Sequence, residues 1–193
     1  MRSIAAVFAA ALVLSGCQSV RDRFDGPQPN PGPCPNALSL YDAHRLVEFR
    51  GEERVLRNVG FTGEILNVRG ACTYTDARVS PIDMQMAVRF AFGRGAAAEG
   101  SEKTYYYFVA VTRTDSAVIA REVFPITVRF PPGENRVELT EEIGSIVIPR
   151  AEATTSGANF EVIVGFELTP EQLAYNRRAE EPAAMQQKKP AAR

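Results

Sequence analysis

Apolar and polar residues alternate with a period of two along much of the chain between residues 55 and 168. The clearest run covers residues 84–92, where Met, Val and Phe alternate with Gln, Arg and Ala. Shorter runs of the same kind cover residues 59–65 and 160–168. Successive side chains of a strand point to opposite faces of a sheet, so these runs predict strands with one apolar face.

Other segments predict strands with different surroundings. Residues 104–113 are apolar on both faces, which indicates a strand that is central in its sheet. The run at 118–130 contains Pro125, and because proline cannot donate to a sheet ladder, this run predicts an edge strand, a bulge or a change of sheet. A polar turn is predicted at 67–70, before a short strand that begins at Cys72.

The remaining strand signals are weaker. Two short strands are predicted at 137–139 and 146–148. Residues 36–50 allow two readings, because Ser39 followed by Asp42 suggests a helix cap, whereas alternation from Arg45 onward is typical of a strand. A first, peripheral strand is the favoured interpretation of this stretch.

A helix signal follows the last strand. Thr169 is a suitable N-cap, Pro170 stands at the first helical position and Gln172 completes a capping box. These residues predict a short C-terminal helix that packs on the end of the domain. Residues 180–193 are mainly Ala, Pro, Gln and Lys, a composition that predicts a disordered tail.

Seven or eight short strands with turn signals between them predict an all-β domain. The absence of long helices between the strands excludes an α/β fold. We expect a single antiparallel, Ig-like or fibronectin-type β-sandwich with a short C-terminal helix. The alternative is a lipocalin-like closed β-barrel, although the Gly-x-Trp signature of that family cannot occur in a chain without tryptophan.

The first seventeen residues have the order of an export signal. Arg2 is followed by an apolar run at 4–14 and then by Leu14-Ser15-Gly16-Cys17. These last four residues resemble a bacterial lipobox, in which the cysteine thiol is acylated and becomes the new N-terminus. A transmembrane anchor is the alternative, but the apolar run is about half of the roughly 20 residues that span a bilayer. Secretion with cleavage elsewhere is a second alternative.

The lipobox resemblance implies a domain plan and a location. Residues 1–16 would be the signal peptide, and residues 17–33, rich in proline, a tether that begins at the lipidated Cys17. Residues 34–179 would form the sandwich. Gln18, where an aspartate would retain some lipoproteins at the inner membrane, favours the outer membrane facing the periplasm. Several acyl chains together give a stable membrane anchor.

The cysteine count fits an exported protein. The chain has three cysteines, so lipidation of Cys17 leaves Cys34 and Cys72, and an oxidising compartment favours a disulfide between them. Two buried free thiols are the alternative. One histidine and no Cys-x-x-Cys pair make a zinc site improbable, and no metal or cofactor is expected.

The charges and candidate catalytic residues narrow the function classes. A net charge of −1 without a basic block argues against nucleic acid as a partner. His44 has no nucleophile motif near it, and Glu141-Glu142 would point to opposite faces of a strand, so no catalytic site is expected. The protein is therefore predicted not to be an enzyme.

Three consecutive tyrosines form the one aromatic cluster with binding potential. Tyr105, Tyr106 and Tyr107 could stack on a sugar or anchor a protein interface. Alternatively, two of them alternate into the core and the third packs under a loop. The favoured interpretation is core packing.

Four segments stand out: Cys34-Pro35, Asp42-Ala43, the closing Gly165-Phe166-Glu167-Leu168-Thr169-Pro170-Glu171-Gln172-Leu173 and Tyr175-Asn176-Arg177. Through these residues in particular, the whole chain resembles a family of small bacterial lipoproteins of unknown function. The family implies no activity. We expect a lipid-anchored adaptor that presents a loop end, or an exposed edge strand near Pro125, to another envelope protein. A glycan- or lipid-binding module is the alternative.

Overall fold

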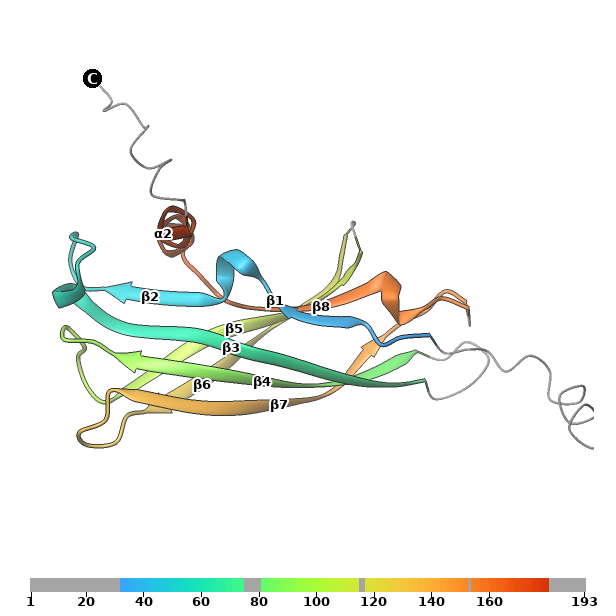
Figure 1. Cartoon of the computed structure of the whole chain (residues 1–193), viewed down its shortest axis with the longest axis horizontal. Coiled ribbons are helices and arrows are strands. Elements are labelled where there is room, and N and C mark those ends of the chain that lie inside the picture. The colour runs from blue at the N-terminus through green and yellow to red at the C-terminus, as the bar shows by residue number, and fades with distance from the viewer. Residues whose placement is uncertain (1–31, 75–80, 115–116, 153, 181–193) are drawn as a thin grey trace, which may run out of the picture. The chain divides into compact units, whose positions relative to one another are not determined.

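The computed structural model describes residues 32–74, 81–114, 117–152 and 154–180, and these form two packed sheets and one α-helix (Figure 1). The strands are β1 (Asn36–Ser39), β2 (Arg45–Phe49), β3 (Val59–Tyr74), β4 (Ile82–Arg94), β5 (Glu102–Arg113), β6 (Val118–Arg129), β7 (Arg136–Ile148) and β8 (Phe160–Phe166). The helix is α2 (Pro170–Glu180). The predicted signal segment, nearly all of the tether and the tail lie outside the described residues.

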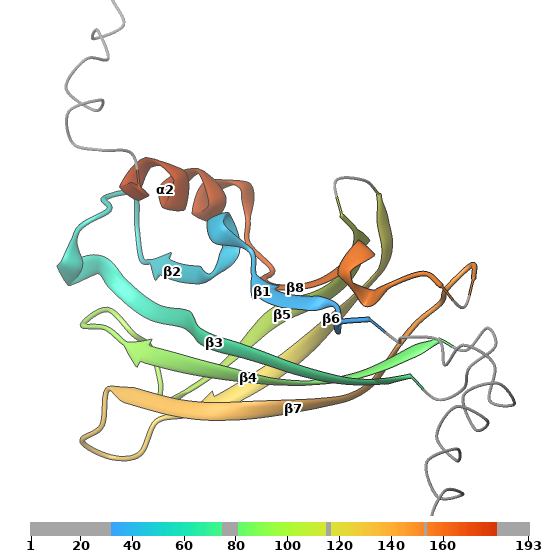
Figure 2. The same cartoon turned by 45° about the vertical axis from the view of Figure 1, so that its right-hand side comes forward.

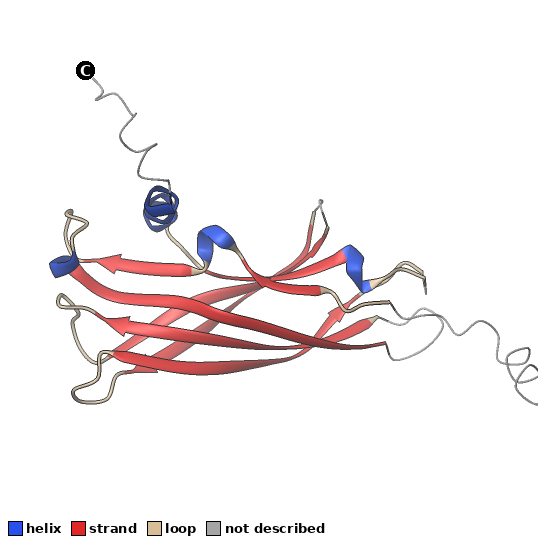
Figure 3. Ribbon diagram, viewed as in Figure 1, coloured by secondary structure: helices blue, strands red, loops and turns tan. Residues whose placement is uncertain are grey.

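The strands form an all-β sandwich. One sheet has the order β1–β8–β5–β6 and the other the order β2–β3–β4–β7. Within the described ranges the two sheets do not close into a barrel, so the sandwich prediction is confirmed and the lipocalin-like alternative is wrong. Figure 3 shows that strands are the main secondary structure of this part of the chain. One pairing departs from the expected antiparallel arrangement, because β1 runs parallel to β8.

One predicted turn and one predicted division between two strands are wrong, because each strand continues through a bulge there. The predicted polar turn at 67–70 lies within β3, which pairs with β4 along its whole length except for a register shift between Ile65 and Asn67. The two short strands predicted at 137–139 and 146–148 are both part of β7, whose pairing shifts near Gly144. A bulge absorbs an extra residue without ending the strand, so polar residues and glycine can occur inside a long antiparallel pair.

The ambiguous stretch at 36–50 holds two strands in different sheets. A 3-10 turn at Tyr41–Ala43 separates β1 from β2, and the chain changes sheets across it. The ring of His44 lies against the carbonyl oxygen of Tyr41 and holds this turn. The expected single peripheral strand is therefore wrong, although both short strands do lie at sheet edges.

Aromatic side chains from both sheets fill the centre of the sandwich. Phe166 of β8 contacts three rings, with centroid distances of 5.8 Å to Phe90, 6.3 Å to Phe92 and 6.5 Å to Tyr105. The same ring covers Gly63 of β3, where an added Cβ would lie 2.8 Å from it. The predicted apolar face of β3 thus includes a position that must lack a side chain.

The predicted capping box is present at the start of α2. The backbone N–H of Thr169 donates to Gln172 Oε1 at 2.9 Å, and the N–H of Gln172 donates to Thr169 Oγ1 at 3.3 Å. The helix then docks through the buried Asn176, whose side-chain amide donates to the carbonyl oxygens of Asp42 and Arg45 at 2.9 and 2.8 Å. These bonds fix α2 beside β2.

The predicted disulfide joins Cys34 to Cys72 and fixes the start of the domain to the end of β3. Tyr74 extends this connection, since its hydroxyl donates to the carbonyl oxygen of Pro33 at 2.8 Å and accepts from the N–H of Gly157 at 2.9 Å. The guanidinium of Arg150, which follows β7, lies 4.9 Å from the centre of the Tyr74 ring.

We expect the C34S/C72S double variant to lose about 3–4 kcal/mol of unfolding free energy, because the bridge spans 38 residues and restricts the unfolded chain. Urea unfolding followed by circular dichroism measures the loss. A reducing agent should bring the wild type to the level of the variant and leave the variant unchanged. Equal unfolding midpoints of the variant and the oxidised wild type would contradict the expectation.

Candidate interaction site

The two sheets leave an apolar groove between one edge strand of each. In the described part of the chain β6 ends one sheet and β7 ends the other, and both lie on the same side of the sandwich (Figure 2). The groove between them has a volume of about 420 Å³. It is lined by Val109, Val111, Ala120, Arg121, Glu122, Phe124, Ile143, Gly144, Ser145, Ile146 and Val147.

The groove lies along the first half of β6 only. Near the end of this strand, Ile126 and Val128 are buried beneath the opposite sheet. Near its start, Val118 and Ile119 are 58% and 44% exposed, and neither lines the groove. One half of the strand is therefore covered by the opposite sheet, and the other half is open to water.

The backbone of β6 turns unpaired polar groups toward the open edge. The carbonyl oxygen of Tyr106 in β5 accepts from the N–H of Glu167, so the backbone of Tyr106 faces away from β6. Its partner Pro125 therefore faces away from β5, where a missing N–H costs nothing. The two-residue period then turns the N–H and C=O groups of Val123 and Arg121 outward as well. The predicted edge position of Pro125 is confirmed.

Two carboxylates occupy positions in the inward-facing register of these edge strands. Glu122 of β6 is paired with Val109, and Glu141 of β7 is paired with Val88. Neither glutamate makes a hydrogen bond or an ion pair with another described residue. From the sequence, Glu122 was not identified as a candidate, and Glu141 was considered only as half of an adjacent pair. The signal that could have identified them is a charged residue at a position of each strand where the alternation predicts an apolar one.

Tyr107 connects the core to the carboxylates. Its ring is buried and stacks on Phe124 at a centroid distance of 5.5 Å. Burial raises the pKa of Tyr107 to about 12, and the nearby carboxylate of Glu141 adds to this increase. Tyr107 is thus held neutral beside a negative group at the inner side of the open edge.

The three predicted binding tyrosines have different surroundings. Tyr105 is buried like Tyr107, and its hydroxyl donates to the carbonyl oxygen of Thr62 at 3.2 Å. Burial also raises the pKa of Tyr105. Tyr106 is 52% exposed and lies on the outer face of the sheet. Only Tyr106 offers its ring to a ligand or partner, and none of the three lines the groove.

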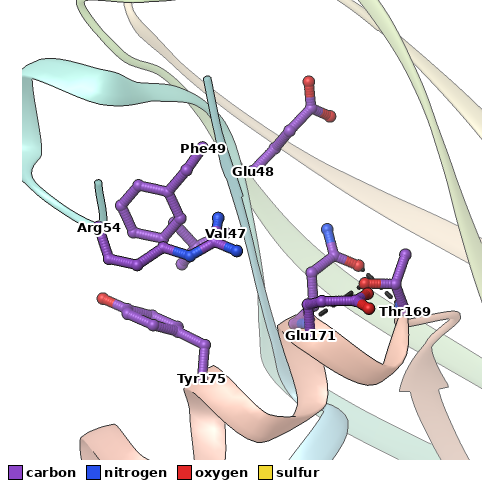
Figure 4. A pocket seen from close by; sticks show the side chains of 8 residues that line it. Val47, Glu48, Phe49, Arg54, Thr169, Glu171 and Tyr175 are labelled. Atoms are coloured by element: carbon purple, nitrogen blue, oxygen red, sulfur yellow. Dashed lines mark hydrogen bonds between the residues drawn. The ribbon is translucent and has the colours of Figure 1, made fainter. Parts of the chain in front are cut away.

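A smaller hollow of about 220 Å³ lies between β2 and the start of α2 (Figure 4). The Arg54 guanidinium lies 5.2 Å from the centre of the Phe49 ring, and Phe49 meets Tyr175 edge to face at 5.0 Å. Bonds from its own N–H and from the Thr169 hydroxyl lower the pKa of Glu171. The polar groups here serve to cap the helix, so the groove is the stronger candidate site.

Two further features concern metal binding and the membrane. Within the described ranges, no group of three His, Cys, Asp or Glu side chains could hold a metal ion. Those ranges also contain no helix with the length and apolarity needed to cross a bilayer. Cys17, the predicted lipidation site, lies outside them.

Comparison of the chain with protein-family models, with curated proteins and with solved structures gives no match in any of the three.

The Glu141→Gln variant tests the electrostatic effect of Glu141 on Tyr107. Because the phenolate of Tyr107 is destabilised by Glu141, we expect Tyr107 to ionise at a lower pH in this variant, although burial keeps its pKa above the ordinary 10.0. NMR titration of the tyrosine ring carbons measures the change. The matched Glu142→Gln variant, altered on the outer face of the same strand, should leave Tyr107 unchanged.

The same shift predicts how stability depends on pH. The folded-state pKa of Tyr107 is raised from 10.0 to about 12, so the unfolded chain loses this proton first. Stability should therefore fall as the pH rises through this window. A smaller fall in the Glu141→Gln variant would agree with the assignment. Identical pH profiles and an unchanged Tyr107 pKa would contradict it.

Proposed function

We propose that the protein is a lipid-anchored, non-enzymatic adaptor of the bacterial envelope, and that its sandwich binds an extended segment of another envelope protein. The observation that carries the binding proposal is the apolar groove between β6 and β7, bordered by two unpaired sheet edges. An added strand would satisfy the outward N–H and C=O groups of Val123 and Arg121 and place alternate side chains in the groove.

The edge of β6 restricts where such a strand can bind. Sheet edges that must stay unpaired are commonly guarded by prolines, bulges or inward charges. The pairing of β6 shifts near Ile119, and Pro125 removes a donor at the other limit. Between these points the edge is open over about the length of a short strand. The register shift and Pro125 therefore favour the addition of one short, specific segment over the addition of any strand.

The second candidate function is binding of a glycan or lipid. The volume of the groove, about 420 Å³, falls within the range of small-molecule sites, and its apolar lining suits an acyl chain. The free backbone groups at its border would remain unpaired in that case. Strand addition uses both the groove and the edge, so it is the better-supported function.

The anchor is proposed from Cys17 and the residues before it. Cells fed an alkyne analogue of palmitate should incorporate the label into the wild-type protein, which should sediment with membranes. The Cys17→Ser variant should lose the label and move to the soluble fraction, because a single thiol carries the modification. Labelling of this variant at the wild-type level would contradict lipidation at Cys17. Sedimentation with inner instead of outer membranes would revise only the location.

Photo-crosslinking in cells tests the binding site. A benzoylphenylalanine at Ala120 is expected to capture one defined envelope protein, because this residue lies in the groove beside the open edge. The second change Val123→Pro should abolish the capture. It removes an outward N–H that β5 does not use, so the sheet should still form, as circular dichroism can verify.

The matched control is Val123→Thr, which changes the side chain and keeps the N–H. Capture should persist in this variant. Capture that survives Val123→Pro in a folded protein would exclude strand addition at β6. Loss of capture in both variants would assign binding to the Val123 side chain instead of the backbone edge. A crosslinked lipid in place of a protein would support the second candidate.

A further inference from the structure

We infer that the partner segment carries a lysine or arginine whose side chain enters the groove beside Glu122, with apolar side chains two residues before and after it. This inference rests on the proposed strand addition and names the chemistry of the partner. Its basis is the combination of an apolar lining with unpaired carboxylates that point inward from the edge strands.

The geometry of an added strand fixes which side chains meet. Residues directly opposite each other on neighbouring strands point to the same face, with Cβ atoms roughly 4.5–5.5 Å apart. The partner residue opposite Glu122 would therefore point into the groove next to its carboxylate. The partner residues two positions away would lie opposite Ala120 and Phe124, where the groove is apolar.

The charges of the groove select a cation for the central position. Closing the groove with a strand removes water from Glu122, and a carboxylate deprived of water without a partner is destabilising. The only cation among the lining residues is Arg121, which cannot compensate. Its guanidinium bonds to Glu167 and lies 4.4 Å from the centre of the Phe108 ring, on the outer face of the sheet. A basic side chain from the partner supplies the missing charge.

Glu141, on the opposite sheet, adds to the preference for a basic side chain from the partner. It lies two residues from Ile143 on the inward face of β7, and its effect on Tyr107 places it near the Tyr107–Phe124 stack. Phe124 in turn lies two residues from Glu122 on the same face of β6. A long basic side chain in this space would meet negative potential from both edges.

The sizes of the lining residues add a second preference. Ala120 is the smallest side chain on the inward face of this part of β6, and it is paired with Val111, which is 5% exposed. An added strand can therefore place a large apolar residue, such as Leu or Phe, opposite Ala120.

A second copy that pairs through β6 or β7 does not supply the required cation. The inward-facing positions of β6 and β7 that border the groove carry apolar residues and the two glutamates. Pairing two copies through either edge would bring carboxylates together and leave them uncompensated. The charge pattern favours a different protein whose exposed segment alternates apolar and basic side chains.

The test is a display selection with random seven-residue peptides against the full chain. Wild type should enrich extended, alternating sequences with Lys or Arg at one inward position, and the Glu122→Gln variant should lose the preference for a basic residue. The matched control, Glu142→Gln, removes one negative charge from an exposed outward position. This variant should keep the preference for a basic residue. Among the enriched peptides, replacing the basic residue with acetyl-lysine should weaken binding to wild type about fivefold, the effect of one favourable cross-strand charge pair.

The outcomes separate this inference from the proposed function. Enriched alternating peptides without a basic residue, or an equal preference for basic residues in the Glu122→Gln variant, would overturn the inference and leave strand addition intact. Failure of wild type to enrich any peptide over the folded Val123→Pro variant would overturn both. Basic peptides that bind the Val123→Pro variant as tightly as they bind wild type would show that binding depends on charge alone. This result would exclude a strand paired with β6.

Discussion

The contact between the Phe166 ring and Gly63 holds the two sheets together at the centre of the fold. The ring from β8 occupies the space that a side chain at Gly63 would need, so one sheet inserts a large group into a gap in the other. Phe90 and Phe92 then surround this ring, and Tyr105 completes the group. Because core packing tolerates little change in volume, this interlock fixes how the sheets approach each other.

Between β6 and β7 the described residues leave a groove open, and the sequence of these two strands explains why. Along the inward face of β6, the residues that follow Ala120 are Glu122 and Phe124, whereas the buried end of the strand carries Ile126 and Val128. On β7, Glu141 interrupts a similar apolar series. Closing the sheets over these carboxylates would remove their hydration without providing partners, which is unfavourable. The groove is thus a consequence of Glu122 and Glu141, which occupy positions where the alternation of each strand otherwise places apolar residues.

The sequence predicted those parts of the fold that depend on local pattern. The alternation at residues 84–92 identified β4, and the double apolar faces at 104–113 identified the central strand β5. Thr169 and Gln172 identified the helix start, because both partners of a capping box lie within one turn. Features of the fold that depend on pairing between distant parts of the chain were harder to predict. The bulges in β3 and β7 resembled turns, and the change of sheet between β1 and β2 has no strong local signal. The same limit applies to the candidate site, which forms only when β6 and β7 come to lie on one side of the sandwich.

The start of the domain lies at the end of the sandwich where the groove opens. Ile146 and Val147 line the groove near the end of β7, and the following Arg150 packs on Tyr74, which binds Pro33. The first described residues and the open end of the groove therefore lie at the same end of the sandwich.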